Sequence, residues 1–222
     1  KPFDIEVKAI NRDNIPGLDI FWQNAVEESQ AIAKSMPADM LTYLILDHYG
    51  GVYLDTDYEL ANSLDELTEN YSFFAFEEPG NQYIGHAIVA SSPHHPVITE
   101  AEHLIKRNLV TPPDYIKNAC SERAYTVLAT GPAMFSVAFA NKANQDTHYK
   151  DTFFPDDGSL SLVRYAFTPA IWSSQVGTHH GSNTWAKKDQ DKPLLGCESC
   201  SSNLQVLDKA NLARAKLSQL TP

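Results

Sequence analysis

The most constraining feature of this sequence is a helical segment that passes through two glycines into a short apolar strand and an acidic triplet. Residues 37–49 carry apolar side chains on one stripe of a helix. Gly50 and Gly51 end that helix, and the apolar run 52–54 behind them predicts a buried strand. The triplet Asp55-Thr56-Asp57 then follows at the carboxyl end of this strand, which is where ligands bind in open α/β sheets.

Strand-like and helix-like patterns alternate along the rest of the chain, which favours an α/β fold with a mixed sheet flanked by helices. The 222 residues suit a single domain with a sizeable core. We expect this domain over residues 1–187, and a polar C-terminal extension or peripheral helix over residues 188–222. Strands are expected at 5–9, 52–54, 73–76, 84–90 and 160–167, and helices at 21–34, 37–49, 96–107 and 130–140.

Composition and charge exclude several classes of protein. The hydrophobic content of 43% is too high for a disordered chain, and no apolar run approaches the ~20 residues that cross a bilayer. With 17 basic and 28 acidic residues, the net charge is −11, which disfavours a nucleic-acid groove because such grooves bind phosphates through Lys and Arg. We therefore expect no nucleic-acid partner and no membrane span. A phosphate ligand would need local positive charge, for example from a metal ion.

The two aspartates of the triplet have the chemistry and spacing that suit a divalent cation. Alternate side chains of a strand share one face, so Asp55 and Asp57 would point the same way, about 7 Å apart, if the strand geometry continues. Hard cations such as Mg²⁺ and Mn²⁺ take carboxylate oxygens together with substrate phosphates. An isolated Asp-x-Asp is more often a turn or a helix cap, so the neighbouring segments decide the interpretation.

Those neighbours resemble the sugar-binding region of the DXD glycosyltransferases, which include Golgi mannosyltransferase-like enzymes and, more distantly, the glucosylating toxins of clostridia. The resemblance is most specific at 49–57, Tyr-Gly-Gly-Val-Tyr-Leu-Asp-Thr-Asp, which follows an Ala-Asp-Met-Leu-Thr-Tyr string at 38–43. Three later stretches fall in the family's order, at 84–92, 130–132 and 179–185. The resemblance covers residues 38–185.

The resemblance implies a GT-A-like fold and a nucleotide-sugar donor, a UDP- or GDP-sugar, held through Mn²⁺ or Mg²⁺. It implies that Asp57 is the primary metal ligand and that Asp55 contacts the ribose or sugar of the donor, or a metal-bound water. These two aspartates would carry the catalytic role. Asp39, one helix upstream, would bind hydroxyl groups of the donor sugar.

The resemblance further implies a closing segment that folds over the diphosphate. Trp185 would supply an indole N–H to the donor, and Asn183 is a second donor-binding candidate in the same segment. A further metal ligand is also implied, and His180 ranks first for it, with Asn183 and His179 as alternatives.

The chain departs from the family pattern in three places. Thr42 stands where the family has an arginine, and a hydroxyl cannot replace a guanidinium in clamping a phosphate or sugar. Either Arg123, Arg164 or Lys187 substitutes for it, or donor binding is weak or altered. Thr184 replaces a serine but keeps the hydroxyl. The family's N-terminal strand, which cradles the nucleobase, is expected to be missing before Lys1.

Three functions are candidates for a chain with this acidic triplet. An aspartate-based phosphatase also places Asp-x-Asp at a strand end, but it requires Thr or Val where this chain has Glu59. A catalytically weak or inactive nucleotide-sugar or carbohydrate-binding module of the same fold stays open because of Thr42. We expect a metal-dependent glycosyltransferase, of hexosyl or N-acetylhexosaminyl class, that moves a sugar to a hydroxyl of a glycan, lipid or protein, with retention implied by the resemblance. The Golgi lumen and a secreted bacterial effector are both compatible locations.

Overall fold

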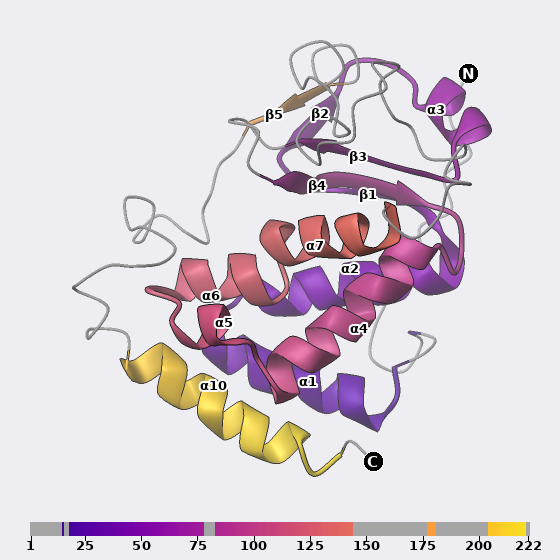
Figure 1. Cartoon of the computed structure of the whole chain (residues 1–222). Helices are drawn as coiled ribbons and strands as arrows, with labels where there is room; N and C mark the ends of the chain where they lie inside the picture. Colours follow the sequence, from indigo (N-terminus) through magenta and orange to yellow (C-terminus); the bar gives the residue numbers. More distant parts are fainter. Residues whose placement is uncertain (1–14, 16–17, 78–82, 144–176, 181–203, 221–222) are drawn as a thin grey trace.

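The structure, a computed structural model, describes residues 15, 18–77, 83–143, 177–180 and 204–220 (Figure 1). Within these residues, helices pack against small antiparallel sheets, which confirms the expected α/β class. The helices are α1 Ile20–Ile32, α2 Met36–Tyr49, α3 Asp65–Asn70, α4 Pro96–Val110, α5 Asp114–Lys117, α6 Glu122–Ala129, α7 Pro132–Ala143 and α10 Leu204–Leu217. The strands are β1 Gly51–Leu54, β2 Tyr58–Leu60, β3 Phe73–Glu77, β4 Ile84–Ser91 and β5 Gly177–His179.

The described strands form two sheets whose pairings are antiparallel. The first has the order β1-β4-β3, with Gly51 of β1 opposite Ser91 of β4. The second pairs β2 with β5, which is about 120 residues away in the sequence, and sets Tyr58 opposite His179. The strands expected at 5–9 and 160–167 lie outside the described residues.

Each face of the three-stranded sheet buries its own apolar cluster. On the face toward the helices, Phe73 and Val89 join a large core with residues of α1, α2, α4, α6, α7 and α10. On the opposite face, Phe74 and Ile88 pack with Leu67 of α3. Figure 1 shows α7 and α2 directly below the sheet, with α3 beside its other face and α10 in the outermost layer. Alternation along the strands therefore sorts these side chains between two covered faces, as the period of a strand requires.

The helices expected from apolar spacing are confirmed as α1, α2, α4 and α7, whereas α3, α5 and α6 were not expected. Residues 122–129 form α6, which begins after Ser121, whose Oγ accepts a hydrogen bond from the N–H of Ala124 at 2.9 Å. The side-chain oxygen satisfies a backbone donor that the first turn leaves free. None of the described helices is long and apolar enough to cross a membrane.

The C-terminal part of the chain contains a helix that packs on the body of the protein. α10 contacts α1 and α4, and it buries Ala210, Ala213 and Leu217 against them. Lys216 Nζ also lies 2.6 Å from Glu28 Oε1 of α1. The domain boundary expected after residue 187 lies outside the described residues and stays a prediction.

Two glycines with positive φ connect α2 to β1. Gly50 has a φ of +64° and its N–H donates to the carbonyl of Leu46 at 2.9 Å, while Gly51 has a φ of +101°. A Cβ at position 50 would lie 2.7 Å from Pro93 Cδ and 2.8 Å from the carbonyl oxygen of Ser91. A Cβ at position 51 would meet no atom within 4 Å. Gly50 is therefore required by backbone conformation and by packing, and Gly51 by conformation alone.

We expect Gly50→Ala to destabilise the fold more than Gly51→Ala does. Strained backbone costs about 1–3 kcal/mol at either position, and the overlap with Pro93 and Ser91 adds about 1–3 kcal/mol at position 50 alone. Urea unfolding of both variants and the wild type measures the difference. Equal losses in the two variants would contradict the packing argument.

Candidate functional site

A turn between β1 and β2 carries the acidic triplet. The N–H of Asp55 donates to the carbonyl of Ala87 on β4 at 2.8 Å, which fixes Asp55 at the end of β1. The N–H of Tyr58 then donates back to the carbonyl of Asp55 at 3.0 Å, and residues 56 and 57 form the turn. The strand geometry therefore does not continue through Asp57, and the turn replaces the strand spacing of about 7 Å that was expected for the two side chains.

The pairing of β5 with β2 brings a histidine to these carboxylates. His179 Nε2 lies 3.3 Å from Asp57 Oδ1 and 3.8 Å from Asp55 Oδ2. One ligand atom from each of the three residues lies within 4.8 Å of the others, an arrangement that can hold a metal ion. The imidazole also stacks on the ring of Tyr58, with ring centroids 6.2 Å apart.

The two neighbouring histidines of this segment point to different partners. His180 Nε2 lies 3.0 Å from Glu59 Oε2, and the backbone N–H of His180 donates to the carbonyl of Asp57 at 3.0 Å. The structure thus brings His179, rather than the first-ranked His180, to the aspartate pair. The other closing-segment candidates, Asn183 and Trp185, lie outside the described residues.

Close contact between β5 and β2 depends on a glycine. A Cβ at Gly177 would overlap the backbone oxygen of Glu59 and lie 2.7 Å from the ring of Tyr58. The absence of a side chain at position 177 lets the two backbones pair, so that His179 reaches the carboxylates two residues further on.

Asp39 lies in the first turn of α2, where Thr130 holds its carboxyl. The side chain is 13% exposed, and its Oδ2 accepts a hydrogen bond from Thr130 Oγ1 at 2.7 Å. Burial raises the pKa of Asp39 to about 7, the Thr130 bond opposes this rise, and the charge of Asp55 adds to it. Asp39 therefore exchanges between its neutral and charged forms near neutral pH, which suits a group that binds sugar hydroxyls as donor or acceptor.

Aromatic and imidazole side chains connect Asp39 to Asp55. Tyr53 Oη donates a hydrogen bond to Asp55 Oδ1 at 2.7 Å, and burial raises the pKa of Asp55 above its usual value. His86 of β4 brings its Nδ1 to 3.5 Å from Asp39 Oδ1, and its ring lies 5.6 Å from that of Tyr53. No local pattern in the sequence indicates a role for Tyr53 or His86.

Thr42, which stands at the family's arginine position, is buried in α2. Its Oγ1 donates to the carbonyl of Ala38 at 2.9 Å, so the hydroxyl is bonded within its own helix. Of the cations expected to substitute for the arginine, Arg123 lies in α6, and Arg164 and Lys187 lie outside the described residues.

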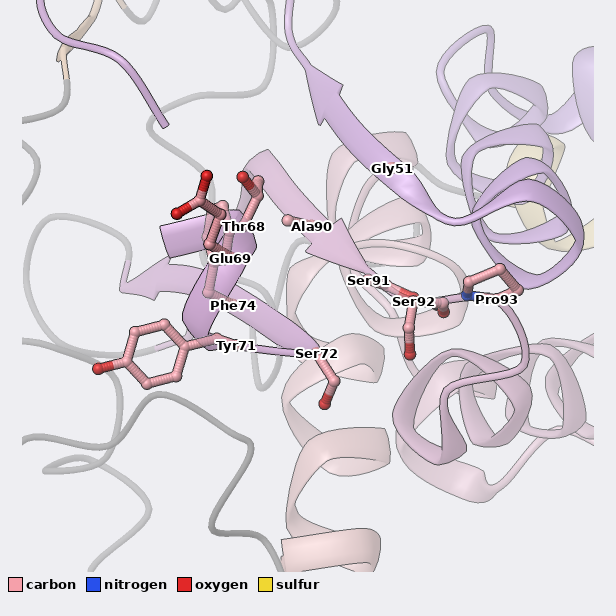
Figure 2. Close-up of a pocket in the computed structure, with 10 residues that line it drawn as sticks. All are labelled: Gly51, Thr68, Glu69, Tyr71, Ser72, Phe74, Ala90, Ser91, Ser92 and Pro93. Carbon is pink, nitrogen blue, oxygen red and sulfur yellow. Dashed lines mark hydrogen bonds between the residues drawn. The ribbon is translucent and has the colours of Figure 1, made fainter. Parts of the chain in front are cut away.

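A cavity of about 450 Å³ lies at the opposite end of β1 from the carboxylates. Figure 2 shows Gly51 at its rim, with Thr68, Glu69 and Tyr71 on one side and the serines of β4 and its following loop on the other. Phe74 and Ala90 also line it. Neither Asp55 nor Asp57 takes part, so this cavity is separate from the candidate site.

The raised pKa of Asp39 predicts a pH-dependent difference in stability between wild type and Asp39→Asn. Because the folded-state pKa of about 7 lies above the ordinary value of 3.8, the carboxyl must lose its proton in a buried position as pH rises. Its contribution to stability is therefore complete below pH ~4 and is lost between pH ~4 and ~7, by at most about 4 kcal/mol. The amide that replaces the carboxyl in the variant does not titrate. Urea unfolding in EDTA should show the variant gaining stability relative to wild type over this range, and parallel pH profiles would contradict the assignment.

The comparisons with known proteins agree with the resemblance drawn from the sequence. The family described as "Glycosyltransferase sugar-binding region containing DXD motif" matches residues 5–74, a range that contains Asp39, Asp55 and Asp57. The α/β arrangement of the described residues is consistent with a GT-A-like fold. No solved structure matches the chain.

Two curated relatives are mannosyl phosphorylinositol ceramide synthases of Saccharomyces cerevisiae. The chain is 28% identical to SUR1 over 130 residues, which cover 59% of this chain and 30% of SUR1. It is 29% identical to CSH1 over 102 residues, which cover 46% of this chain and 25% of CSH1. The matched part of the chain thus spans less than a third of either relative. Residues 5–74 of the chain match the glycosyltransferase sugar-binding region that contains a DXD motif, which supports the resemblance.

Proposed function

We propose that this protein is a metal-dependent glycosyltransferase that moves a sugar from a nucleotide-sugar donor to an acceptor hydroxyl. The observation that carries the proposal is the convergence of Asp55, Asp57 and His179 at the end of β1. The two aspartates lie within residues 5–74, which match the DXD sugar-binding region. Asp39 is buried, and its pKa is raised by burial and by the charge of Asp55. Its carboxyl would bind hydroxyl groups of the donor sugar.

The donor atoms of the site fit a divalent cation. Adjacent ligands of a six-coordinate ion with bonds of about 2.1 Å lie about 3 Å apart, and His179 Nε2 lies 3.3 Å from Asp57 Oδ1. The two carboxylates suit Mn²⁺ or Mg²⁺, and the imidazole would add one nitrogen ligand. Asp57 and His179 would hold the ion, and Asp55 would either join them or contact the ribose.

The side chains of the site would divide the work of transfer. A bound cation supplies positive charge to the diphosphate leaving group. Tyr53 Oη holds Asp55 in place, and Thr130 holds Asp39, so that both carboxyls are oriented before the donor arrives. The acceptor hydroxyl would form the new bond to C1 of the sugar as the bond from C1 to the diphosphate breaks. Its proton would pass to the departing diphosphate oxygen, which leaves the glycoside and the nucleoside diphosphate as products. We assign no side chain as a glycosyl nucleophile, and retention of configuration remains an implication of the family resemblance.

The names of the relatives guide the choice of donor and acceptor. Both are described as mannosyl phosphorylinositol ceramide synthases, so a mannosyl donor and a lipid acceptor are the first combination to test. The alternative is a catalytically weak or inactive binding module of the same fold. The buried Thr42 favours that alternative because it removes a cation from the donor site. Metal-dependent nucleotide binding without any turnover of donor would distinguish the alternative from the enzyme.

Asp57→Ala should abolish metal-dependent nucleotide binding and turnover while the protein stays folded. Calorimetric titration of UDP and GDP, each with and without Mn²⁺, measures the effect on wild type and variant. One nucleotide should bind the wild type only with Mn²⁺, because the ion would supply positive charge to the diphosphate in a protein whose net charge is −11. Unchanged Mn²⁺-dependent binding or turnover in Asp57→Ala would overturn the assignment.

The neighbouring histidines provide a matched pair of variants. His179→Ala should weaken Mn²⁺-dependent nucleotide binding by more than about tenfold, because even outer-shell partners of metal ligands contribute that much. His180→Ala removes a partly exposed side chain that pairs with Glu59, and it should change the affinity by less than about twofold. The opposite ranking of the two variants would assign the metal ligand to His180, the first-ranked candidate from the sequence.

A further inference from the structure

His86 lies on a face of the sheet that the alternation of its own strand does not predict. Ile88 and Ala90 of β4 pack on the face toward α3. Counting back by two residues, His86 would lie on that same face. Its ring instead packs against Tyr43 and Phe135 on the face toward the helices, with centroids 5.1 Å and 6.1 Å away.

An irregularity in the pairing of β3 with β4 accounts for this placement. Ala75 pairs with Val89 and Glu77 pairs with Ile84, so β4 advances five residues while β3 advances two. The extra residues of β4 include His86. Strand irregularities of this kind redirect side chains and occur often beside active sites. Regular pairing of the sheet is thus interrupted at the residues where the His86 imidazole points toward Asp39.

The environment of His86 favours a neutral ring with a defined partner. Tyr43, Tyr53 and Phe135 surround the imidazole, and burial lowers the pKa of His86 to about 4. A neutral ring has one N–H. Nδ1 lies 3.5 Å from Asp39 Oδ1, whereas Nε2 is buried and has no hydrogen-bond partner among the described residues. A proton on Nδ1 would therefore face the carboxyl, and closing the gap to hydrogen-bond length requires a movement of a few tenths of an ångström.

We propose that His86 is a positioning residue for the Asp39 carboxyl and, through it, for the sugar of the nucleotide-sugar donor. Thr130 holds one carboxyl oxygen and His86 approaches the other, so the two residues together fix the plane of the carboxyl. His86 also packs on Tyr53, which holds Asp55. The inference rests on the proposed function, and it adds a residue that would act through Asp39.

Three substitutions at position 86 separate positioning from simple packing. His86→Phe keeps a ring in the aromatic surroundings but removes both nitrogens. His86→Asn places an amide N–H near the position of Nδ1, and His86→Gln reaches the position of Nε2 instead. Calorimetry with Mn²⁺ measures the affinity of each variant for GDP and GDP-mannose, and for UDP and UDP-glucose. The difference within each pair gives the contribution of the sugar. Slow hydrolysis of the donor without acceptor gives the turnover, and thermal unfolding checks that each variant is folded.

The expected result is a loss confined to the sugar. His86→Phe and His86→Gln should keep the affinity for the nucleotide that wild type binds, but lose about tenfold or more in donor hydrolysis and in any added affinity due to the sugar. His86→Asn should recover most of both. Wild-type behaviour of folded His86→Phe, or recovery by Gln and not by Asn, would overturn the proposal.

A second measurement separates failure of this inference from failure of the proposed function. If wild type binds neither nucleotide with Mn²⁺, the proposed function fails. The ¹⁵N chemical shifts of the His86 ring in the free protein test the positioning contact without any donor. The inference predicts a neutral ring protonated at Nδ1, and a proton on Nε2 would overturn it.

Discussion

The pairing of β5 with β2 is the interaction on which the candidate site depends. Its three residue pairs join segments about 120 residues apart and set His179 opposite Tyr58, next to the turn that carries Asp57. The hydrogen bond from the N–H of His180 to the carbonyl of Asp57 continues the pairing past the strand. Because these contacts are between backbones, they require the bare backbone of Gly177. Without this pairing, the acidic triplet would lose the imidazole of His179.

The second constraint is the unit formed by α2, two glycines and β1. Its two ends bring Asp39 and Asp55 to the same region, where Thr130 and Tyr53 each donate a hydrogen bond to one of them. Burial raises the pKa of both carboxyls, so negative charge on Asp39 and Asp55 is held at a cost in stability. A cation and a donor with many hydroxyl groups would relieve that cost. Such a trade between stability and binding is typical of functional sites.

Local patterns in the sequence are sufficient to predict this unit. Contacts between segments that are distant in the sequence could not be predicted from them. Each signal extends over only a few residues: the apolar stripe of 37–49, the glycine pair, and the short strand behind it. The structure contains each of them. The choice between His179 and His180 depends instead on the register of β5 against β2, and a shift by one residue exchanges their faces. His86 was missed for a related reason, since the alternation that correctly sorts Ile88 and Val89 fails at the irregularity in β4.

The central claim is that a metal ion and a nucleotide bind together at the end of β1. Anomalous diffraction from crystals grown with Mn²⁺ and the nucleotide that binds would locate the ion directly. We predict a manganese peak bonded to Asp57 and His179, with the diphosphate on its open side and Asp55 at the ion or the ribose. A peak at His180 and Glu59, or a nucleotide bound away from Asp57 with no metal, would contradict this account.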